Sequence, residues 1–266
     1  MKLGFIGAGN MARAIINGWL SQGQKAEIYL HSAHKASYGP YAKEHGLHAC
    51  ASNTEVISNA DIIFLAVKPI VLAEVLHEIK ATVQAKKPVI VSMVTGVSIA
   101  EIADLLELTP KDLEIVRIMP NVNAEIAAGM TALNASPAVT ETNFMRVKGL
   151  FEMIGQTEIL PEKDFSTFVA LAGSSPAYVY FFIDAMSRAG VKYGLKKEQA
   201  TKIAAQAVLG SAQKVLADQK TPMQLVDDVC SPGGTTIAGL LAMEEAGFMT
   251  AVIKGMDATI DKDQGK

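Results

Sequence analysis

The chain has 266 residues, of which half are hydrophobic and 19% are charged, a composition that excludes a disordered chain and fits one large or two modest globular domains. Its 24 Lys and Arg nearly balance 27 Asp and Glu, so the net charge is −3 and no nucleic-acid partner is expected. Only two cysteines are present, Cys50 and Cys230, and all five histidines lie in the first third of the chain, so we expect no metal site and no His-based catalytic triad.

Hydrophobic stretches are short throughout the chain. Polar residues or prolines interrupt each one before it reaches roughly 18 residues, which predicts a soluble protein with no membrane-spanning helix and no membrane partner. The N-terminal segment is similar to a signal peptide only in Lys2 and the apolar run after it, because Asn10 and Arg13 break that run. With so few cysteines, the cytoplasm is the expected compartment.

The first part of the chain alternates short β-type runs with amphipathic helical stretches, a pattern typical of βαβ units around a parallel sheet. Strands are predicted at 2–6, 26–30, 47–51, 61–67, 88–93, 113–119 and 157–160. Helices are predicted at 11–20 and 142–153, and Ser98 with Glu101 forms a capping box that predicts the start of another. The predicted fold class is therefore α/β, with an N-terminal, doubly wound, mostly parallel Rossmann-like sheet.

After Pro161 the periodicity is helical, which predicts one domain at 1–161 and an all-α domain at 162–266. Helices are predicted at 163–189, 198–217, 222–230, 235–246 and 248–260. The first is apolar nearly all round, including Phe181 and Phe182, so it must be buried on every side. Because about 105 residues form too small a core to bury it, we predict an intertwined helical homodimer.

A glycine-rich segment, Gly7-Ala8-Gly9-Asn10-Met11-Ala12, follows the first predicted strand and opens the first helix, the context of a dinucleotide-binding fingerprint. Gly7 permits the tight turn, Gly9 lets the backbone approach a pyrophosphate, and the small Ala12 allows close packing of helix and strand. The helix N-terminus supplies N–H groups to the phosphates. We expect Gly7, Gly9, Asn10 and Met11 to contact NAD(P); the alternative is a strand-to-helix turn with no ligand.

The end of the second predicted strand indicates which coenzyme is used, because an NAD site normally places Asp or Glu there for the ribose 2′-hydroxyl. Here the segment is Leu30-His31-Ser32-Ala33-His34-Lys35, which contains no acid. Ser32 and Lys35 could hold a 2′-phosphate, with His31 or His34 contributing when protonated. NADPH is therefore the expected coenzyme and NADH the weaker one; the alternative is that these are solvated loop residues.

Four further segments carry a family resemblance. They are Ala66-Val67-Lys68-Pro69, Arg117-Ile118-Met119-Pro120-Asn121, Gly173-Ser174-Ser175-Pro176-Ala177-Tyr178 and Ser231-Pro232-Gly233-Gly234-Thr235-Thr236. With the fingerprint, they make the chain resemble the Δ1-pyrroline-5-carboxylate reductases of proline biosynthesis from the first strand to the final helices. The resemblance implies that Ala66, Val67, Lys68, Pro69, Met119, Pro120 and Asn121 line the coenzyme and that the last two segments shape the substrate pocket. It also implies hydride transfer from NAD(P)H to a cyclic imine acid, giving L-proline, and assembly of dimers into a decamer.

The Ser231–Thr236 segment precedes an apolar helical run, so its glycines expose backbone N–H groups at a helix start, a suitable cradle for a carboxylate. We expect Thr235 and the amides of Gly233 and Gly234 to hold the substrate carboxylate and Thr236, the predicted catalytic residue, to hydrogen-bond the ring nitrogen. Ser231 is also a predicted substrate-binding residue. The alternative is a capping loop with no ligand.

Pro176 lies inside an otherwise continuous apolar helix, so it should kink that helix and free a carbonyl group. Gly173 and Ser174 leave room there for a ligand, and Ser174 is a predicted substrate-binding residue. A purely structural kink is the alternative.

The chain departs from the family pattern at two places. Where the family has His-Pro-x-x-Leu-Arg-Asp, this chain has Thr221-Pro222-Met223-Gln224-Leu225-Val226-Asp227, so any role for a basic side chain at Val226 is lost. Thr221 can still cap that helix with Pro222 at its first position. The Arg that usually follows the second strand is also missing.

Two alternative functions share some of these sequence features. An NADP-dependent β-hydroxyacid dehydrogenase shares the two-domain plan, but it needs an active-site lysine that the stretch 173–178 lacks. A non-catalytic coenzyme-binding regulator would lack a substrate pocket beside the nicotinamide. An imine can be protonated on nitrogen before the hydride arrives, whereas a ketone needs an acid in the site, so the lack of His in the helical half favours an imine.

Overall fold

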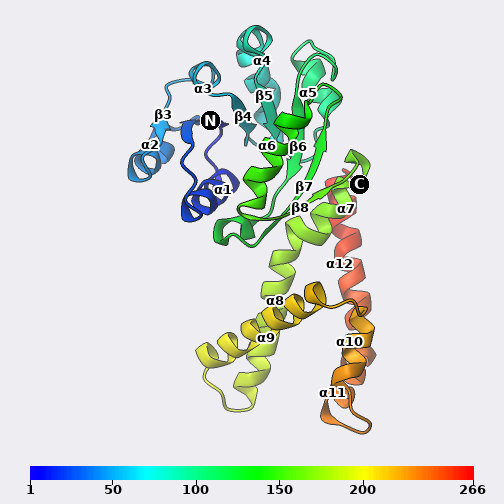
Figure 1. Cartoon of the computed structure of the whole chain (residues 1–266). Coiled ribbons are helices and arrows are strands. Elements are labelled where there is room, and N and C mark those ends of the chain that lie inside the picture. The colour runs from blue at the N-terminus through cyan, green and yellow to red at the C-terminus, as the bar shows by residue number, and fades with distance from the viewer. The chain divides into compact units, whose positions relative to one another are not determined.

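The computed structural model describes all residues from 1 to 266. Contacts divide the chain into two compact units, Met1–Ser174 with Ile260–Lys266, and Ser175–Thr259 (Figure 1). This division falls later than the predicted boundary at Pro161. The reason is that the segment after Pro161 packs on the sheet of the first unit, where Phe165 and Phe168 are buried in a cluster with Met119.

Eight strands form one sheet in the first unit, in the order β3-β2-β1-β4-β5-β6-β7-β8. The strands are β1 Lys2–Ile6, β2 Glu27–His31, β3 His48–Ala49, β4 Ile62–Leu65, β5 Val89–Ser92, β6 Ile115–Met119, β7 Gly129–Ala135 and β8 Gly155–Ile159. The strands from β3 to β6 are parallel, β7 is antiparallel to β6, and β8 is parallel to β7. The predicted doubly wound, mostly parallel sheet is therefore confirmed, and its strand order reverses between β1 and β4, where such sheets bind ligands.

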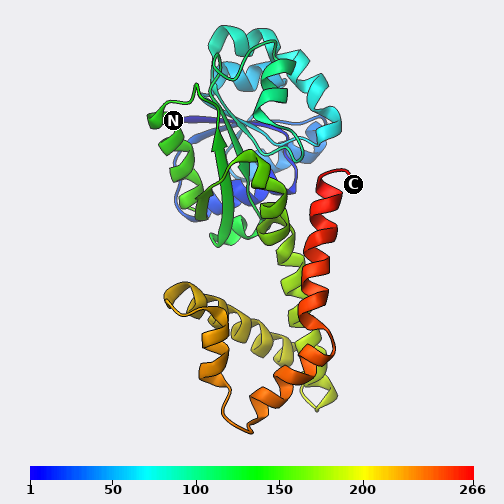
Figure 2. The same ribbon diagram turned by 90° about the vertical axis from the view of Figure 1, so that its right-hand side faces the viewer.

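Helices cover both faces of this sheet (Figure 2). They are α1 Asn10–Ser21, α2 Lys35–Glu44, α3 Asn53–Asn59, α4 Pro69–Lys86, α5 Ile99–Leu105, the 3₁₀ turn η1 Val122–Ile126, and α6 Glu141–Glu152. Side chains of α1, α2 and α6 belong to one buried cluster, and those of α3, α4 and α5 belong to the other. Trp19, the only tryptophan, is fully buried between Phe64 and Phe151 and donates its Nε1–H to the Leu150 carbonyl at 2.7 Å.

Most predicted elements of this unit are confirmed with shifts of a few residues at their ends. The capping box is also confirmed, because the Ser98 side chain accepts from the Glu101 N–H while the Glu101 side chain accepts from the Ser98 N–H. Strand β7 was missed. Its sequence, GMTALNA, has a single β-branched residue, Thr131, and no aromatic residue, so it does not predict a strand; the strand forms by pairing with β6 and β8.

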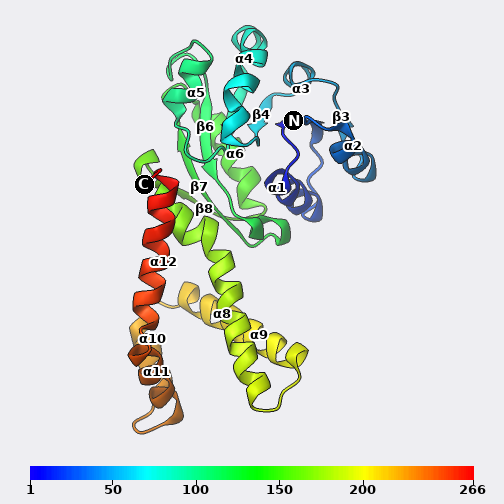
Figure 3. The same ribbon diagram turned by 180° about the vertical axis from the view of Figure 1, so that it is seen from behind.

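The second unit is helical throughout (Figure 3). Its helices are α8 Ser175–Lys192, α9 Lys197–Ala217, α10 Pro222–Val229, α11 Thr235–Glu245 and α12 Phe248–Asp263, the last of which continues into the first unit. Thr221 caps α10 with Pro222 at the first helical position, as predicted. The predicted helix 163–189 is not continuous, because it starts as the 3₁₀ turn η2 Glu162–Asp164 and α7 Phe165–Phe168 and then becomes π-helical over η3 Val169–Ser174 before α8.

Apolar side chains remain exposed on the helical unit. In α8 only Pro176 and Ser187 are buried, and Phe181 is 78% exposed. The expected burial of this helix on every side is therefore not achieved within one chain.

The helical stretch Glu162–Lys192 contains an 18-residue window with a mean hydropathy of 1.3, so it is long and apolar enough to cross a membrane by length and composition alone. This corrects the expectation that no stretch qualifies, which required an uninterrupted apolar run, whereas a helix with a few charged residues can still be apolar on average. The core helix of a soluble protein meets the same criterion, so this stretch does not by itself indicate a membrane.

Candidate functional site

Gly7 brings three segments of the predicted coenzyme site together at the end of β1. Its φ is +104°, a left-handed value that favours glycine, and its N–H donates to the His31 carbonyl at the end of β2 at 2.8 Å. A Cβ at Gly7 would lie 2.3 Å from the Ala66 carbonyl oxygen. Any side chain here would thus separate the glycine-rich loop from the segment that follows β4.

The start of α1 is open as a phosphate site requires. Its N-cap is Gly9, so no side chain caps the helix, and nothing lies within 4 Å of a Cβ added there. Asn10 is exposed and Met11 half-buried, whereas Ala12 is buried against the core. The first N–H groups of the helix and its positive dipole end fit the pyrophosphate of a dinucleotide.

Ser32 and Lys35 lie in the loop after β2 and at the first position of α2, whose N-cap is His34. Ser32 is half-buried and Lys35 exposed, and the loop contains no carboxylate. The sequence-based interpretation missed Arg13, which lies one helical turn into α1. Its guanidinium donates to the Ala8 carbonyl at 3.0 Å and to the Ser37 carbonyl at 2.7 Å, so it links the glycine-rich loop to the start of α2.

Two strand ends complete the coenzyme side of the sheet. Ala66 and Val67 follow β4 half-buried, and Lys68 and Pro69 are the N-cap and first residue of α4. The parallel strands β5 and β6 end at the same edge. The loop after β5, residues 93–98, therefore lies at this edge as well. These residues are not among the predicted coenzyme residues, although Gly96, whose φ is +74°, could have indicated a tight turn there.

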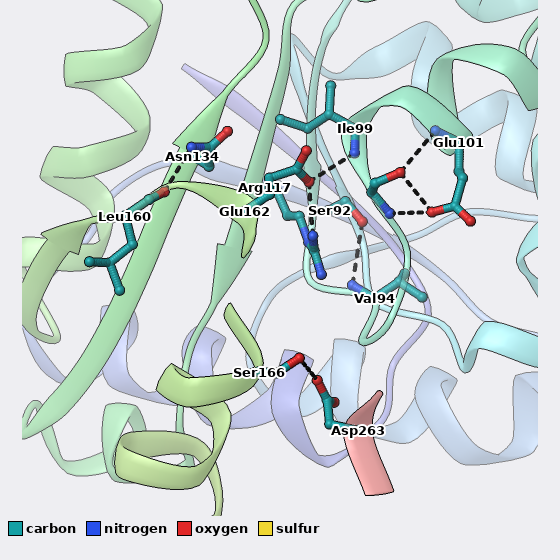
Figure 4. Close-up of polar contacts among 11 residues, drawn as sticks. Ser92, Val94, Ile99, Glu101, Arg117, Asn134, Leu160, Glu162, Ser166 and Asp263 are labelled. Atoms are coloured by element: carbon teal, nitrogen blue, oxygen red, sulfur yellow. Dashed lines mark hydrogen bonds and ion pairs between the residues drawn. The ribbon is translucent and has the colours of Figure 1, made fainter. Parts of the chain in front are cut away.

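Arg117 begins the segment that ends in Met119-Pro120-Asn121, but its own side chain is internal. It is 7% exposed and donates to Glu162 Oε1 at 2.8 Å (Figure 4). Its guanidinium also lies over the ring of Phe165. Glu162 Oε1 also accepts from the Ile99 N–H at the start of α5. The ion pair thus binds the segment after β8 to the sheet and to α5.

Asn121 is also buried, at 5% exposure, and both polar atoms of its side-chain amide bind backbone groups of the chain. Its Oδ1 accepts from the Met130 N–H at 3.2 Å and its Nδ2 donates to the Ala172 carbonyl at 3.0 Å. Of the three predicted coenzyme residues here, Asn121 therefore directs both polar atoms of its side chain to the protein backbone.

The Ser231–Thr236 loop has the geometry of an anion cradle. Gly233 has φ of +69°, a left-handed value that favours glycine, and a Cβ at Gly234 would lie 2.4 Å from the Ser231 hydroxyl, which would have to turn away to make room. Gly234 is the N-cap of α11 and provides no side chain to cap it. This leaves the first N–H groups of α11, beginning at Thr235, at an uncapped helix N-terminus.

One amide differs from the expectation. The Gly234 N–H, expected to bind a carboxylate, donates to the Ser231 carbonyl at 3.0 Å, which closes the turn. The Gly233 amide and the first turn of α11 are the remaining donors.

Thr236 is the second residue of α11, and it borders a pocket of about 790 Å³ among α9, α10 and α11. Val226 and Cys230 also line this pocket, whose remaining lining is largely aliphatic. The position that is basic in the family pattern therefore lines the same pocket as Thr236, here with an apolar side chain.

Known proteins match the chain in both halves. A family model described as pyrroline-5-carboxylate reductase dimerisation matches residues 162–266, and one described as NADP oxidoreductase coenzyme F420-dependent matches residues 2–96. The pyrroline-5-carboxylate reductase of Escherichia coli (strain K12) is 40% identical over 265 residues, which cover 99% of this chain and 97% of that protein. The chain belongs to the pyrroline-5-carboxylate reductase family.

Solved structures of the family agree with this reductase over its whole length. The enzyme from Streptococcus pyogenes has a TM-score of 0.90 at 39% identity and covers 100% of this chain and 99% of its own. A Plasmodium falciparum pyrroline carboxylate reductase with NADP bound has a TM-score of 0.88 at 30% identity, covering 100% of this chain and 97% of its own. The resemblance read from the sequence is confirmed, and the β-hydroxyacid dehydrogenase and the non-catalytic regulator are set aside.

Proposed function

We propose that this reductase transfers a hydride from NADPH to the imine carbon of 1-pyrroline-5-carboxylate and so forms L-proline, the last step of proline biosynthesis. The observation that carries the proposal is the glycine-capped start of α11, which offers backbone N–H groups and the Thr236 hydroxyl for a small imine acid. The coenzyme, when bound, supplies the hydride.

The chain's own residues bind and orient the substrate. Uncapped N–H groups at the start of α11 hold the carboxylate without an arginine, together with the Gly233 amide, Ser231 and Thr235. The Thr236 hydroxyl hydrogen-bonds the ring nitrogen while that atom changes from planar iminium to tetrahedral amine. Ser174, the last residue of the π-helical turn η3, is the substrate-binding residue of the Gly173–Tyr178 segment.

On the coenzyme side, Gly7, Gly9, Asn10 and Met11 surround the pyrophosphate at the start of α1. Ser32 and Lys35 hold the 2′-phosphate, and Arg13 keeps their loop against the glycine-rich turn. The strand ends at Ala66, Val67, Lys68 and Pro69, and at Met119 and Pro120, line the nicotinamide half.

We further propose that the reductase is a soluble cytoplasmic homodimer without a membrane partner, and that dimers assemble into a decamer. The family model for residues 162–266 is a dimerisation domain, and the exposed apolar side chains of α8 need a covering surface. A pocket of about 790 Å³ is much larger than a five-membered ring acid requires, which favours a second protomer closing it.

A spectrophotometric assay tests the activity. Purified reductase, 1-pyrroline-5-carboxylate and NADPH should lose absorbance at the NADPH band and form proline in equal amounts. Oxidation of NADPH without proline, or no oxidation at all, would contradict the proposal.

A further inference from the structure

Asn121 lies in the coenzyme motif, yet its side chain is directed into the protein. Both polar groups of its amide serve backbone partners on other segments, the Met130 N–H of β7 and the Ala172 carbonyl of η3. A buried amide used in this way cannot turn to a ligand without breaking its hydrogen bonds to the buried Ala172 carbonyl and the half-buried Met130 N–H. Its function must therefore be sought in the segments that it joins.

The Ala172 carbonyl needs such a partner for a reason visible in the sequence. In an α-helix it would accept from the residue four positions later, which is Pro176 and has no N–H. Ala172 is 9% exposed, so water does not replace the missing donor freely. The Asn121 amide supplies the donor, and the segment around Ala172 is π-helical rather than α-helical.

π-Helical turns are rare because their hydrogen bonding is less favourable than that of the α-helix, and they persist where neighbouring groups hold them. Here the turn ends at Ser174, directly before Ser175 and Pro176. The backbone at Gly173 and the direction of the Ser174 side chain therefore depend on the π-helical form of this turn.

We propose that Asn121 is a positioning residue for the substrate: its amide holds the Ala172 carbonyl, keeps residues 169–174 π-helical, and thereby places Gly173 and Ser174 for the imine acid. Because Asn121 directly follows Met119 and Pro120 at the end of β6, one side chain couples the coenzyme strand end to a substrate motif. This inference rests on the proposed substrate role of Ser174.

The variant Asn121→Asp tests it. An ionised carboxylate cannot donate to the Ala172 carbonyl, whereas a protonated one can, and burial raises the pKa of a carboxyl group. Relative to wild type at each pH, kcat/KM for 1-pyrroline-5-carboxylate should fall at least about tenfold near pH 8 and recover toward pH 6, as expected for one lost buried hydrogen bond. The Kd for NADPH, measured by fluorescence titration, should change less than about twofold, because both polar atoms of the Asn121 side chain bind protein backbone.

The matched control is Asn134→Asp. Asn134 also donates its amide to a carbonyl, that of Leu160 at 2.7 Å, but away from the π-helical turn (Figure 4). It should show no pH-dependent recovery of kcat/KM. The result that would overturn the proposal is equal loss in both variants without recovery, or equal loss of substrate and NADPH affinity in Asn121→Asp.

If Asn121→Asp does not fold near pH 8, a second pair of variants tests the positioning role of Asn121. Pro176→Ala provides an N–H that competes for the same carbonyl and favours the α-helical form. Its effect on KM for the imine should be less than additive with that of Asn121→Ala, because both act on one hydrogen bond. Additive effects would contradict the proposal that both residues act through the hydrogen bond to the Ala172 carbonyl. If the wild-type enzyme does not reduce the imine at all, the proposed function is contradicted instead.

Discussion

No side chain caps α11, whose N-cap is Gly234, and Thr236 in its first turn is the catalytic residue that we propose. We predict that Thr236→Ala lowers kcat/KM for 1-pyrroline-5-carboxylate roughly tenfold to a hundredfold, chiefly in kcat, because the lost hydrogen bond strengthens in the transition state. NADPH affinity should stay nearly unchanged. Thr236→Ser should recover most of the activity and Thr235→Ser should change little; a Thr236→Ala enzyme with wild-type kcat and KM would leave protonation to solvent.

Lys35 and Ser32 are the residues to which we assign NADPH preference. Comparison of kcat/KM for the two coenzymes should favour NADPH, and Lys35→Ala should reduce that preference several-fold by raising KM for NADPH while leaving NADH almost unaffected. The effect is modest because a single exposed lysine binds phosphate less strongly than a paired arginine fork. A clear NADH preference that Lys35→Ala does not alter would contradict the assignment.

The raised pKa of Tyr41 predicts that the folded state loses stability at alkaline pH. Burial is the main cause that raises its pKa from 10.0 to about 12, and its hydroxyl donates to Asn17 Oδ1 at 2.7 Å. Since the folded chain keeps this proton where the unfolded chain loses it, stability should fall as pH rises from 10 toward 12. Thermal unfolding of Tyr41→Phe should show a shallower fall in Tm across this window than wild type, and Tyr193→Phe, at an 81% exposed position, should match wild type.

At the scale of elements, the carbonyl groups at the C-terminal end of helix α3 accept hydrogen bonds from a side chain of another helix. Lys86 of α4 donates to the carbonyls of Ile57, Ser58 and Ala60, at 2.6, 3.0 and 2.7 Å. A cation at a helix C-terminus satisfies the last carbonyls and the negative dipole end. Lys86→Met should therefore lower the free energy of unfolding by about 1–2 kcal/mol, allowing for the partial exposure of the ammonium group.

Urea unfolding followed by the fluorescence of Trp19 measures this change within the first unit. Lys80→Met is the control, since its surface ion pair with Glu107 should contribute less than about 1 kcal/mol. Equal midpoints for Lys86→Met and wild type would show that water satisfies the three carbonyls equally well.

At the scale of the whole molecule, the exposed apolar surface of the helical unit predicts an obligate dimer. Phe181, Tyr193 and Leu216 are 78%, 81% and 85% exposed in one chain. Such side chains are stabilised only when a second copy covers them. Analytical ultracentrifugation at micromolar concentration should show a dimer or a multiple of it, and Phe181→Asp should shift the protein toward monomer and lower activity; a fully active wild-type monomer would refute the dimer.

The sequence by itself determined the features that local physics controls. Periodicity located most strands. Ser98 and Thr221 indicated helix starts by their capping chemistry, and Gly7 predicted the tight turn in which the structure shows a left-handed φ. The motif segments were enough to recognise the family, because each combines turn, cap and ligand requirements in a few consecutive residues.

Only the tertiary structure decided the features that depend on partners distant in the chain. Strand β7 exists because β6 and β8 pair with it, although its own residues have weak strand propensity. Pro176 predicted a freed carbonyl, but not that Asn121 would satisfy it, and no local pattern showed Arg13 joining the Ala8 and Ser37 carbonyls. The contacts from Asn121 to Ala172 and from Arg13 to Ser37 join residues far apart along the chain, and their free energy becomes available only when folding brings the partners together and removes the water that would otherwise bind them.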